Sequence, residues 1–473
     1  MAVLVLFGCI GGPAQSGNAD SQLPPQQPPS QEGAQPAGHG PLPIHAIEPR
    51  IPTGIENGLI KVPDPLSGHN PLFPLKARAL PAPGESFPDP EFGTNLTRVT
   101  RTLGLRHEYS RFDPFNADKS MVLLQVPESG EWRVYGTRTL PYDDQPNLKA
   151  SLSMEEPRWD PYYQEILWGL RDFKIAIYNV TDQTEFVVKD FSLDGVIGPI
   201  VRAEPDLYRI TMNNEGESSL DKRYWAFILQ GTGDDYRPRY IFTWDRQEDK
   251  VLGVYQISPS ESSIDWVSMS SLGNYVLIGG DDTDRGNITG LMMANKELKR
   301  FHKLDYATAH SDVGLDTDGR EILVMQNTRT DYIDMIPIDW NTESIDESGG
   351  SYEGTNRIPL IKLNYNSEDP EGLNSGVHIS CNAPGYCVIS TTIGPNVPEQ
   401  NWLDRSMVLV RLDNDPETFY LAKMYGTTQD YWEETHAAIS TDGRTVVWAT
   451  NWNQHVGTEN AKNMFEMKLE LGG

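Results

Sequence analysis

The chain has 473 residues, with 67 acidic and 39 basic side chains and a formal net charge of −28 at pH 7. Nucleic acids and anionic membrane surfaces attract proteins through basic patches, so this charge argues against both as main partners. The 11 tryptophans, 20 tyrosines, 41 glycines and 35 prolines are typical of many short strands joined by turns. Few segments show the apolar period of a helix, so we expect little helix.

The first nine residues have the form of the end of a lipoprotein signal. A short apolar run leads into Gly8 and Cys9, and in such signals a cysteine at this place carries the lipid. The run is too short to cross a membrane as a helix. We therefore interpret residues 1–9 as a signal remnant. We predict a protein exported to the bacterial cell envelope or cell surface, which meets the membrane only through a lipid anchor on Cys9.

Residues 10–90 are predicted to be a linker. They are rich in proline, glutamine and glycine and show no apolar period, so they cannot bury enough surface to offset the entropy lost on ordering. Between residues 44 and 90 the apolar content rises, and we expect this part to drape over the outside of the folded domain. The folded domain itself is assigned to residues 91–473.

The folded domain begins with a strand near residues 96–100, which we expect to complete the last repeat and close a ring. After it comes a hairpin unit that recurs seven times, at spacings of roughly 45 to 65 residues. Its clearest copies have a tight turn, such as Asp318-Gly319 and Asp442-Gly443, between two alternating apolar runs. The seven copies begin near residues 111, 158, 219, 266, 310, 378 and 434.

Most repeats also contain a third and a fourth predicted strand, for example residues 174–179 followed by 184–188. Four strands in each of seven repeats predict an all-β fold, a seven-bladed β-propeller with four-stranded blades. A two-sheet sandwich would not produce sevenfold self-similarity. In the sixth repeat, Cys381 and Cys387 flank a turn, where they form either a local disulfide or two buried thiols.

A candidate site follows from the propeller geometry. The innermost strands of all blades run in the same direction, so residues equally far before each turn lie at one height around the channel. Residues two apart on a strand share a face. The residues that this places at one mouth of the channel are His310, Asp312, His378, Glu434 and His436.

Imidazoles and carboxylates together are suited to a divalent metal such as Mn²⁺, Zn²⁺ or Fe²⁺. The alternative is that these histidines only bond backbone carbonyls between blades. The first blade carries His107, Tyr109 and Arg111 at the equivalent place, and the second carries Arg158. The sequence has no Ser/His/Asp hydrolase arrangement, and the glycine-containing turn at residues 231–235 precedes no helix, so we expect no organic cofactor.

The Thr-Asp-Gly hairpins, as in residues 316–319 and 440–443, resemble the repeat of TolB-type propellers. Among such propellers, the histidines that open inner strands, His310, His378 and His436, resemble the channel histidines of oligogalacturonate lyases and, more loosely, ulvan lyases. The resemblance covers residues 95–471 as a fold but only single residues as a site. In oligogalacturonate lyases the last blade carries two histidines two residues apart, whereas this chain has Glu434 in place of the first.

The resemblance implies β-elimination on a uronate, in which a base removes the proton α to the carboxylate and a metal or arginine stabilises the developing charge. It gives His107 or Tyr109 the role of base or acid and Arg111 or Arg158 that of carboxylate clamp, with His310, His378 and His436 as metal ligands. The alternative is a non-catalytic, TolB-like envelope propeller. The expected partner is accordingly an oligosaccharide or an envelope protein, and we expect a monomer.

Overall fold

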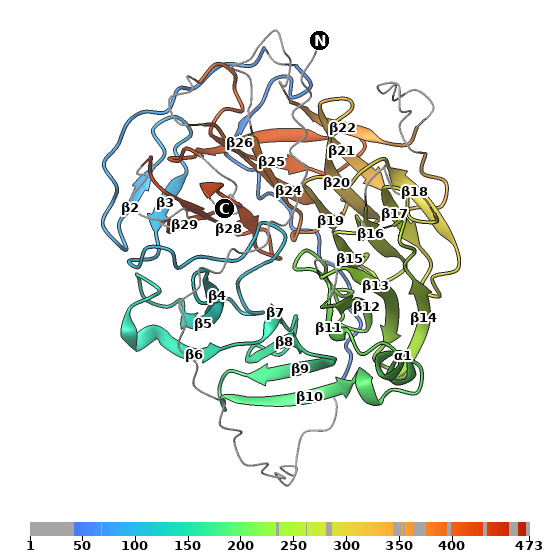
Figure 1. Cartoon of the computed structure of the whole chain (residues 1–473). Helices are drawn as coiled ribbons and strands as arrows, with labels where there is room; N and C mark the ends of the chain where they lie inside the picture. Colours follow the sequence, from blue (N-terminus) through green and yellow to red (C-terminus); the bar gives the residue numbers. More distant parts are fainter. Residues whose placement is uncertain are drawn as a thin grey trace, which may run out of the picture. The chain divides into compact units, whose positions relative to one another are not determined.

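The computed structural model describes residues 42–67, 69–232, 236–261, 263–280, 286–343, 352, 355–363, 375–394, 399–428, 433–453 and 462–469. Residues 44–473 form one compact unit. Its strands form seven antiparallel sheets, which confirms the predicted seven-bladed β-propeller (Figure 1). No helix among the described residues has both the length and the apolar character needed to cross a membrane. Cys9 lies outside the described residues.

The first three blades follow one another in the chain. Blade 1 contains β4 (Met121–Val126), β5 (Glu131–Gly136) and β6 (Leu148–Leu152). Blade 2 contains β7 (Glu155–Trp159), β8 (Ile166–Arg171), β9 (Lys174–Asn179) and β10 (Thr184–Asp190). Blade 3 contains β11 (Leu207–Thr211), β12 (Tyr224–Gly231), β13 (Pro238–Asp245) and β14 (Lys250–Gln256).

Blades 4 to 6 have the same order of strands, from the innermost outward. Blade 4 contains β15 (Trp266–Met269), β16 (Val276–Gly279), β17 (Leu291–Ala294) and β18 (Phe301–Asp305). Blade 5 contains β19 (Ser311–Leu315), β20 (Glu321–Asn327), β21 (Tyr332–Pro337) and β22 (Ile358–Lys362). Blade 6 contains β23 (Ser375–Ser380), β24 (Tyr386–Thr392), β25 (Ser406–Arg411) and β26 (Glu417–Lys423).

Blade 7 is built from both ends of the domain. Its inner strands β27 (Ala438–Ile439), β28 (Thr445–Thr450) and β29 (Asn463–Lys468) come from the C-terminal end. β3 (Asn95–Arg98) pairs with β29, with Leu96 opposite Met467, and β2 (Ser86–Pro88) pairs with β3. The predicted closing strand is therefore confirmed, and it gives the edge of β29 a hydrogen-bonded partner.

Blade 1 departs from the predicted four strands. Its inner edge has only two isolated bridges, Arg106 to Gln125 and Phe115 to Val122. Pro114 lies between them and has no backbone N–H to donate, so a regular ladder cannot continue through it. The irregular segment nevertheless occupies the inner position, because the backbone N–H of Leu123 donates to the Pro114 carbonyl.

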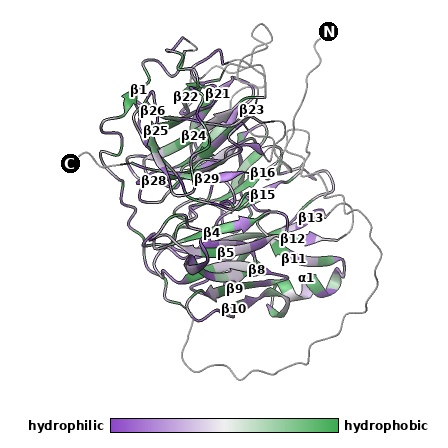
Figure 2. Ribbon diagram, turned by 90° about the vertical axis from the view of Figure 1, so that its left-hand side faces the viewer, coloured by the Kyte–Doolittle hydropathy of each residue, from purple (hydrophilic) through white to green (hydrophobic). Residues whose placement is uncertain are grey.

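Helix is scarce, as the sequence predicted. Within the described residues the α-helix is α1 (Ile197–Ala203), which is accompanied by the 3₁₀ turns η1 (Gln145–Asn147) and η2 (Phe191–Leu193). The hydrophobic residues instead lie on the blade strands, shown green in Figure 2. They form clusters of fully buried aliphatic and aromatic side chains within and between neighbouring blades.

The chain from residue 44 to residue 90 contacts the propeller. β1 (Ile60–Lys61) pairs with β26 as a fifth strand of blade 6. Val62 has no exposed surface and Ile55 has 1%, and each belongs to a hydrophobic cluster of blades 5 to 7. Apolar side chains spaced along a proline-rich segment thus fix it to the outside of the blades.

The turns between the first and second strands have the backbone conformation that the sequence predicted. Gly273, Gly319, Gly385 and Gly443 all have positive φ, between 73° and 83°. Glycine adopts this left-handed conformation without a steric penalty. In the sixth repeat, where the sequence left two alternatives, Cys381 and Cys387 form a disulfide across the turn, with their Cα atoms 4.2 Å apart.

Candidate metal and catalytic site

Three side chains of the predicted set meet beside the inner strands of blades 6 and 7. His378 lies on β23, and Glu434 and His436 lie just before β27 in the next blade. One ligand atom from each lies within 4.8 Å of the other two, and all three residues are buried. We call His378, Glu434 and His436 the His/Glu cluster.

The cluster is held by contacts between its own members and by the neighbouring blade. The Nε2 atom of His378 contacts a carboxylate oxygen of Glu434. The rings of His378 and His436 meet edge to face, with centroids 4.0 Å apart. His436 has a φ of 47°, a left-handed conformation that is uncommon for residues other than glycine. This backbone turn brings Glu434 and His436, two residues apart, to one centre.

Burial keeps the histidines of this region neutral. It lowers the pKa of both His107 and His310 to about 3, and it lowers the pKa values of His378 and His436 well below the usual range. The positive charge of Lys462 lowers the last two further. Neutral imidazole is the form that binds a metal ion.

Lys462 is a component that the sequence did not point to. It is fully buried, and its Nζ atom donates to the Glu434 carbonyl oxygen over 2.6 Å. It lies next to β29, the third strand of blade 7, and not among the residues that precede the inner-strand turns. Its ammonium group supplies a positive charge beside the His/Glu cluster.

Tyr109 and His310 adjoin the cluster. The Tyr109 hydroxyl lies 3.4 Å from Nδ1 of His310. The Tyr109 ring lies 5.4 Å from that of His378 and 5.1 Å from that of His436, and the His310 ring lies 4.7 Å from that of His378. A phenol and a neutral imidazole are therefore within reach of any molecule bound at the cluster.

His107 and Asp312 have local partners instead. The Nε2 atom of His107 donates to the backbone carbonyl of His436 over 2.6 Å, the bond between blades that the sequence left as the alternative role of these histidines. The Asp312 carboxylate accepts hydrogen bonds from the backbone N–H groups of Cys381 and Val313. Asp312 therefore links blade 5 to blade 6 by a hydrogen bond. It does not belong to the His/Glu cluster.

Arg111 is buried, and its guanidinium already has partners. It forms an ion pair with the Glu215 carboxylate at 2.9 Å, donates to Ser311 Oγ at 2.8 Å and lies 4.5 Å above the Trp266 ring. The Tyr109 hydroxyl is among the groups that act on it electrostatically. Arg111 thus places positive charge next to Tyr109, with Glu215 as its present anion.

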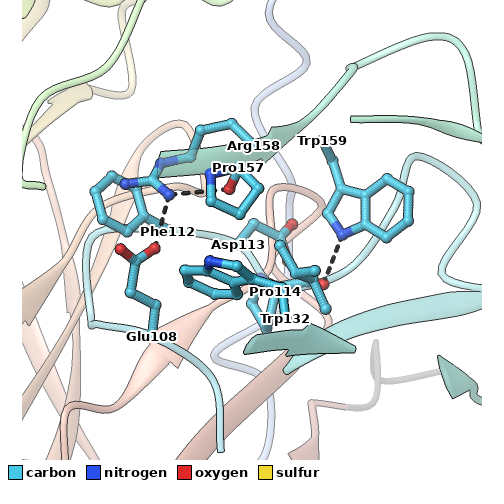
Figure 3. A pocket seen from close by; sticks show the side chains of 9 residues that line it. Glu108, Phe112, Asp113, Pro114, Trp132, Pro157, Arg158 and Trp159 are labelled. Atoms are coloured by element: carbon cyan, nitrogen blue, oxygen red, sulfur yellow. Dashed lines mark hydrogen bonds and ion pairs between the residues drawn. The ribbon is translucent and has the colours of Figure 1, made fainter. Parts of the chain in front are cut away.

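Arg158 is held in a similar way by the first blade (Figure 3). Its guanidinium pairs with the Glu108 carboxylate at 2.6 Å and lies 3.3 Å from the centre of the Phe112 ring. It also donates to the backbone carbonyls of Pro157 and Asn214. Burial raises the pKa of Glu108 to about 7, and Arg158 opposes this shift. The Arg158 guanidinium therefore already has a carboxylate, an aromatic ring and two backbone carbonyls as partners.

The donor set of the His/Glu cluster fits a divalent metal ion. Two imidazoles and one carboxylate are common ligands of Mn²⁺, Fe²⁺ and Zn²⁺. Two ligands bound at ~2.1 Å to one ion lie at most about 4.2 Å apart, so the three ligand atoms, which now lie within 4.8 Å of one another, need to move closer together. The cluster's own residues could hold an ion after small side-chain movements.

Comparison with solved structures finds proteins that share this fold. A structure described as oligogalacturonate lyase in complex with manganese superimposes with a TM-score of 0.52 and 10% sequence identity, over 82% of this chain and 96% of the other. Oligogalacturonate lyase from Vibrio parahaemolyticus gives a TM-score of 0.50 and 10% identity, over 81% and 96% of the two chains. The chain shares the fold of oligogalacturonate lyases. No protein-family model and no curated protein sequence matches it.

Proposed function

We propose that this protein is a metal-dependent polysaccharide lyase that cleaves uronate-containing oligosaccharides by β-elimination. The observation that carries the proposal is the His/Glu cluster, a buried set of metal-ligand side chains beside the inner strands of a propeller with the oligogalacturonate lyase fold. The proposed metal ligands are His378, Glu434 and His436. The manganese named for one structural neighbour supports a divalent ion, and the donor set equally suits iron or zinc.

In the proposed reaction, a base removes the proton α to the uronate carboxylate. The electron pair of that C–H bond forms a carbon–carbon double bond, the bond to the β-oxygen breaks, and this oxygen takes up a proton. A divalent ion at the cluster would supply positive charge for the carboxylate while negative charge develops on it.

The residues assigned to proton transfer are Tyr109 and His310. His310 is neutral because burial lowers its pKa to about 3, and its Nδ1 atom lies 3.4 Å from the Tyr109 hydroxyl, so the pair can pass a proton between substrate and imidazole. His107 was the other predicted acid or base, but its Nε2 atom already donates to a carbonyl. Arg111 lies beside Tyr109 and would help to hold the substrate carboxylate.

The activity is tested with the full chain supplied with Mn²⁺ and a panel of uronate polymers, by the ultraviolet absorbance of the unsaturated product. Tyr109→Phe should lower kcat by roughly 100-fold or more, the scale of a lost general acid or base, and should leave the bound metal unchanged. Exposed Tyr236 is a matched control, and Tyr236→Phe should keep full activity. Absence of unsaturated product from every polymer in the panel would count against the lyase.

A non-catalytic binding propeller is the second candidate function. It is favoured by the arginines, since Arg111 and Arg158 already have carboxylate partners in Glu215 and Glu108. A propeller of this kind would bind an envelope protein or glycan without changing it. It predicts that the full chain gives no product with any uronate polymer but retains an oligosaccharide or envelope protein in a pull-down experiment.

We further propose that the chain acts as a monomer, exported and anchored in the bacterial envelope through Cys9. Mass spectrometry of the membrane fraction would detect a lipid-modified peptide that begins at Cys9. Cys9→Ser should release the protein from that fraction. Light scattering of the released protein should give the mass of one chain.

A further inference from the structure

A cavity of about 410 Å³ lies at the end of the channel opposite the His/Glu cluster. The inner strands lead from one to the other. In blade 7, His436 precedes β27, whereas Thr441 follows it and lines the cavity. None of His378, Glu434 and His436 lines the cavity, so the cavity is a separate site. Its volume is in the range of small-molecule sites, about 300 to 1,000 Å³.

The N-terminal segment forms one wall of this cavity. Residues 47–50 line it, together with the turns of the blades. The segment is fixed to blade 2, where the Tyr162 hydroxyl donates to the Ala46 carbonyl over 3.0 Å. Nε2 of His45 lies 3.0 Å from the Tyr163 hydroxyl. The chain therefore covers a space that would otherwise open directly to solvent.

Lys222 occupies an unusual position in the wall. Its backbone N–H donates to the Ser219 carbonyl, as the N–H of Gly443 donates to that of Ser440 in blade 7, so the two are equivalent turn positions. Four blades have glycine there, whereas blades 1 and 3 have Lys119 and Lys222, with φ values of 59° and 56°. A lysine in a left-handed conformation is strained, and such residues persist where the surrounding structure or a function requires them.

Lys222 is a mostly buried residue whose ammonium group has no direct partner among the described residues. The residue is 8% exposed and lines the cavity, and among the described residues no hydrogen bond or ion pair reaches its Nζ atom. Its nearest aromatic neighbour is the Trp225 ring, 5.9 Å away. A charge that is largely removed from water is costly unless it is paired, so an anion bound in the cavity would stabilise this group. The charged groups that act on it are Glu217, Asp160, Arg158 and Asp221.

The acidic neighbours differ in what they can offer a ligand. The Asp160 carboxylate already accepts from the backbone N–H groups of Tyr162 and Tyr163 and from the indole of Trp168. Glu217 also lines the cavity, and its carboxylate can accept hydrogen bonds from hydroxyl groups. Trp159 and Tyr162 add aromatic surface to the same wall.

We propose that this cavity binds a small hydroxylated carboxylate of the sugar-acid class. The carboxylate of the ligand pairs with the Lys222 ammonium, and its hydroxyl groups donate to Glu217. The carbon–hydrogen faces of the sugar ring lie against Trp159 and Tyr162. The cavity takes no part in bond cleavage and is distinct from the His/Glu cluster.

The test is isothermal titration calorimetry of the full chain with D-glucuronate and with D-glucose, which has a hydroxymethyl group in place of the carboxylate. D-glucuronate should bind, and D-glucose should bind at least tenfold more weakly. Lys222→Gly should weaken D-glucuronate binding at least tenfold while the chain stays folded, because glycine is the residue of the sibling turns. Lys222→Met, which keeps the length of the side chain, should show the same loss.

The double variant His378→Ala/His436→Ala separates this proposal from the lyase. It should lose the metal of the proposed active site and keep its affinity for D-glucuronate. The cavity proposal is overturned if the wild type does not bind D-glucuronate or binds D-glucose equally well. It is also overturned if both Lys222 variants keep the wild-type affinity, or if only the double histidine variant loses it.

Discussion

Two lysines occupy the left-handed turn position, and their replacement by glycine should change the stability in opposite directions. Lys119 in blade 1 has a φ of 59° and Lys222 in blade 3 has a φ of 56°. The left-handed conformation costs an ordinary residue about 1–2 kcal/mol, and glycine avoids this cost but loses about 0.5–1 kcal/mol through its freer unfolded chain. The backbone alone therefore predicts a gain of roughly 0.5–1 kcal/mol at either position.

The side chains distinguish the two positions. The Lys119 ammonium donates to Ser440 Oγ and Thr445 Oγ1 and pairs with Asp442, so it ties blade 1 to blade 7. Loss of these partly exposed contacts should cost about 2 kcal/mol. The Lys222 ammonium has no such contact, and burial lowers its pKa. Lys222→Gly should therefore raise the free energy of unfolding by about 1 kcal/mol, and Lys119→Gly should lower it by about 1 kcal/mol.

The assay is urea unfolding of both variants and the wild type at pH 7, after dialysis to remove small molecules, followed by fluorescence of the buried tryptophans. The two variants should differ by roughly 2 kcal/mol with the wild type between them. Equal destabilisation by the two substitutions would refute the reasoning, because it would mean that the Lys222 side chain stabilises the fold as much as that of Lys119.

Three further predictions concern the fold and its response to pH and reduction. Leu96→Ala on the closing strand removes a fully buried side chain and should cost about 2–5 kcal/mol in urea unfolding, whereas Leu103→Ala, at a residue that is 53% exposed, should change the stability by less than about 0.5 kcal/mol. Burial lowers the pKa of His107 to about 3, so its contribution to stability is complete above pH 6.5 and is lost as the pH falls. His107→Gln keeps a donor to the His436 carbonyl and cannot titrate. Between pH 7 and pH 5 its free energy of unfolding should fall by about 2 kcal/mol less than that of the wild type. An identical fall in both proteins would contradict the lowered pKa of His107. The Cys381–Cys387 disulfide closes only a short loop, so its removal in Cys381→Ser/Cys387→Ser should lower the free energy of unfolding by no more than about 3 kcal/mol. Failure of this variant to fold would contradict a local role of the disulfide.

The sequence predicted the blades well because their signals are local. The strand expected at 174–179 is β9 with the same bounds, and the turn glycines Gly319 and Gly443 have the left-handed backbone that their position requires. Alternating apolar residues and tight turns depend on near neighbours in the chain. The ring closure through Leu96 and Met467 was also predictable, since an unpaired first strand has one remaining edge to join.

The candidate site was predictable only in part. Counting back from the turns brought His378, Glu434 and His436 to one height, and they do meet. The same count could not show that Arg158 faces Glu108 or that Asp312 faces a backbone N–H, because these partners lie on other blades. Lys462 was not predicted because it lies next to the third strand of its blade, far in the sequence from the turns of the inner strands.

The most direct test of the account is the metal content of the purified full chain, measured by elemental analysis after equilibration with Mn²⁺, Fe²⁺ or Zn²⁺ and removal of the excess. The wild type and the control His45→Ala/His69→Ala, whose histidines lie outside the cluster, should retain about one ion per chain. His378→Ala/His436→Ala should retain none and remain folded by circular dichroism. A wild type without metal, or a double variant that keeps it, would contradict the assignment of the His/Glu cluster as the metal site.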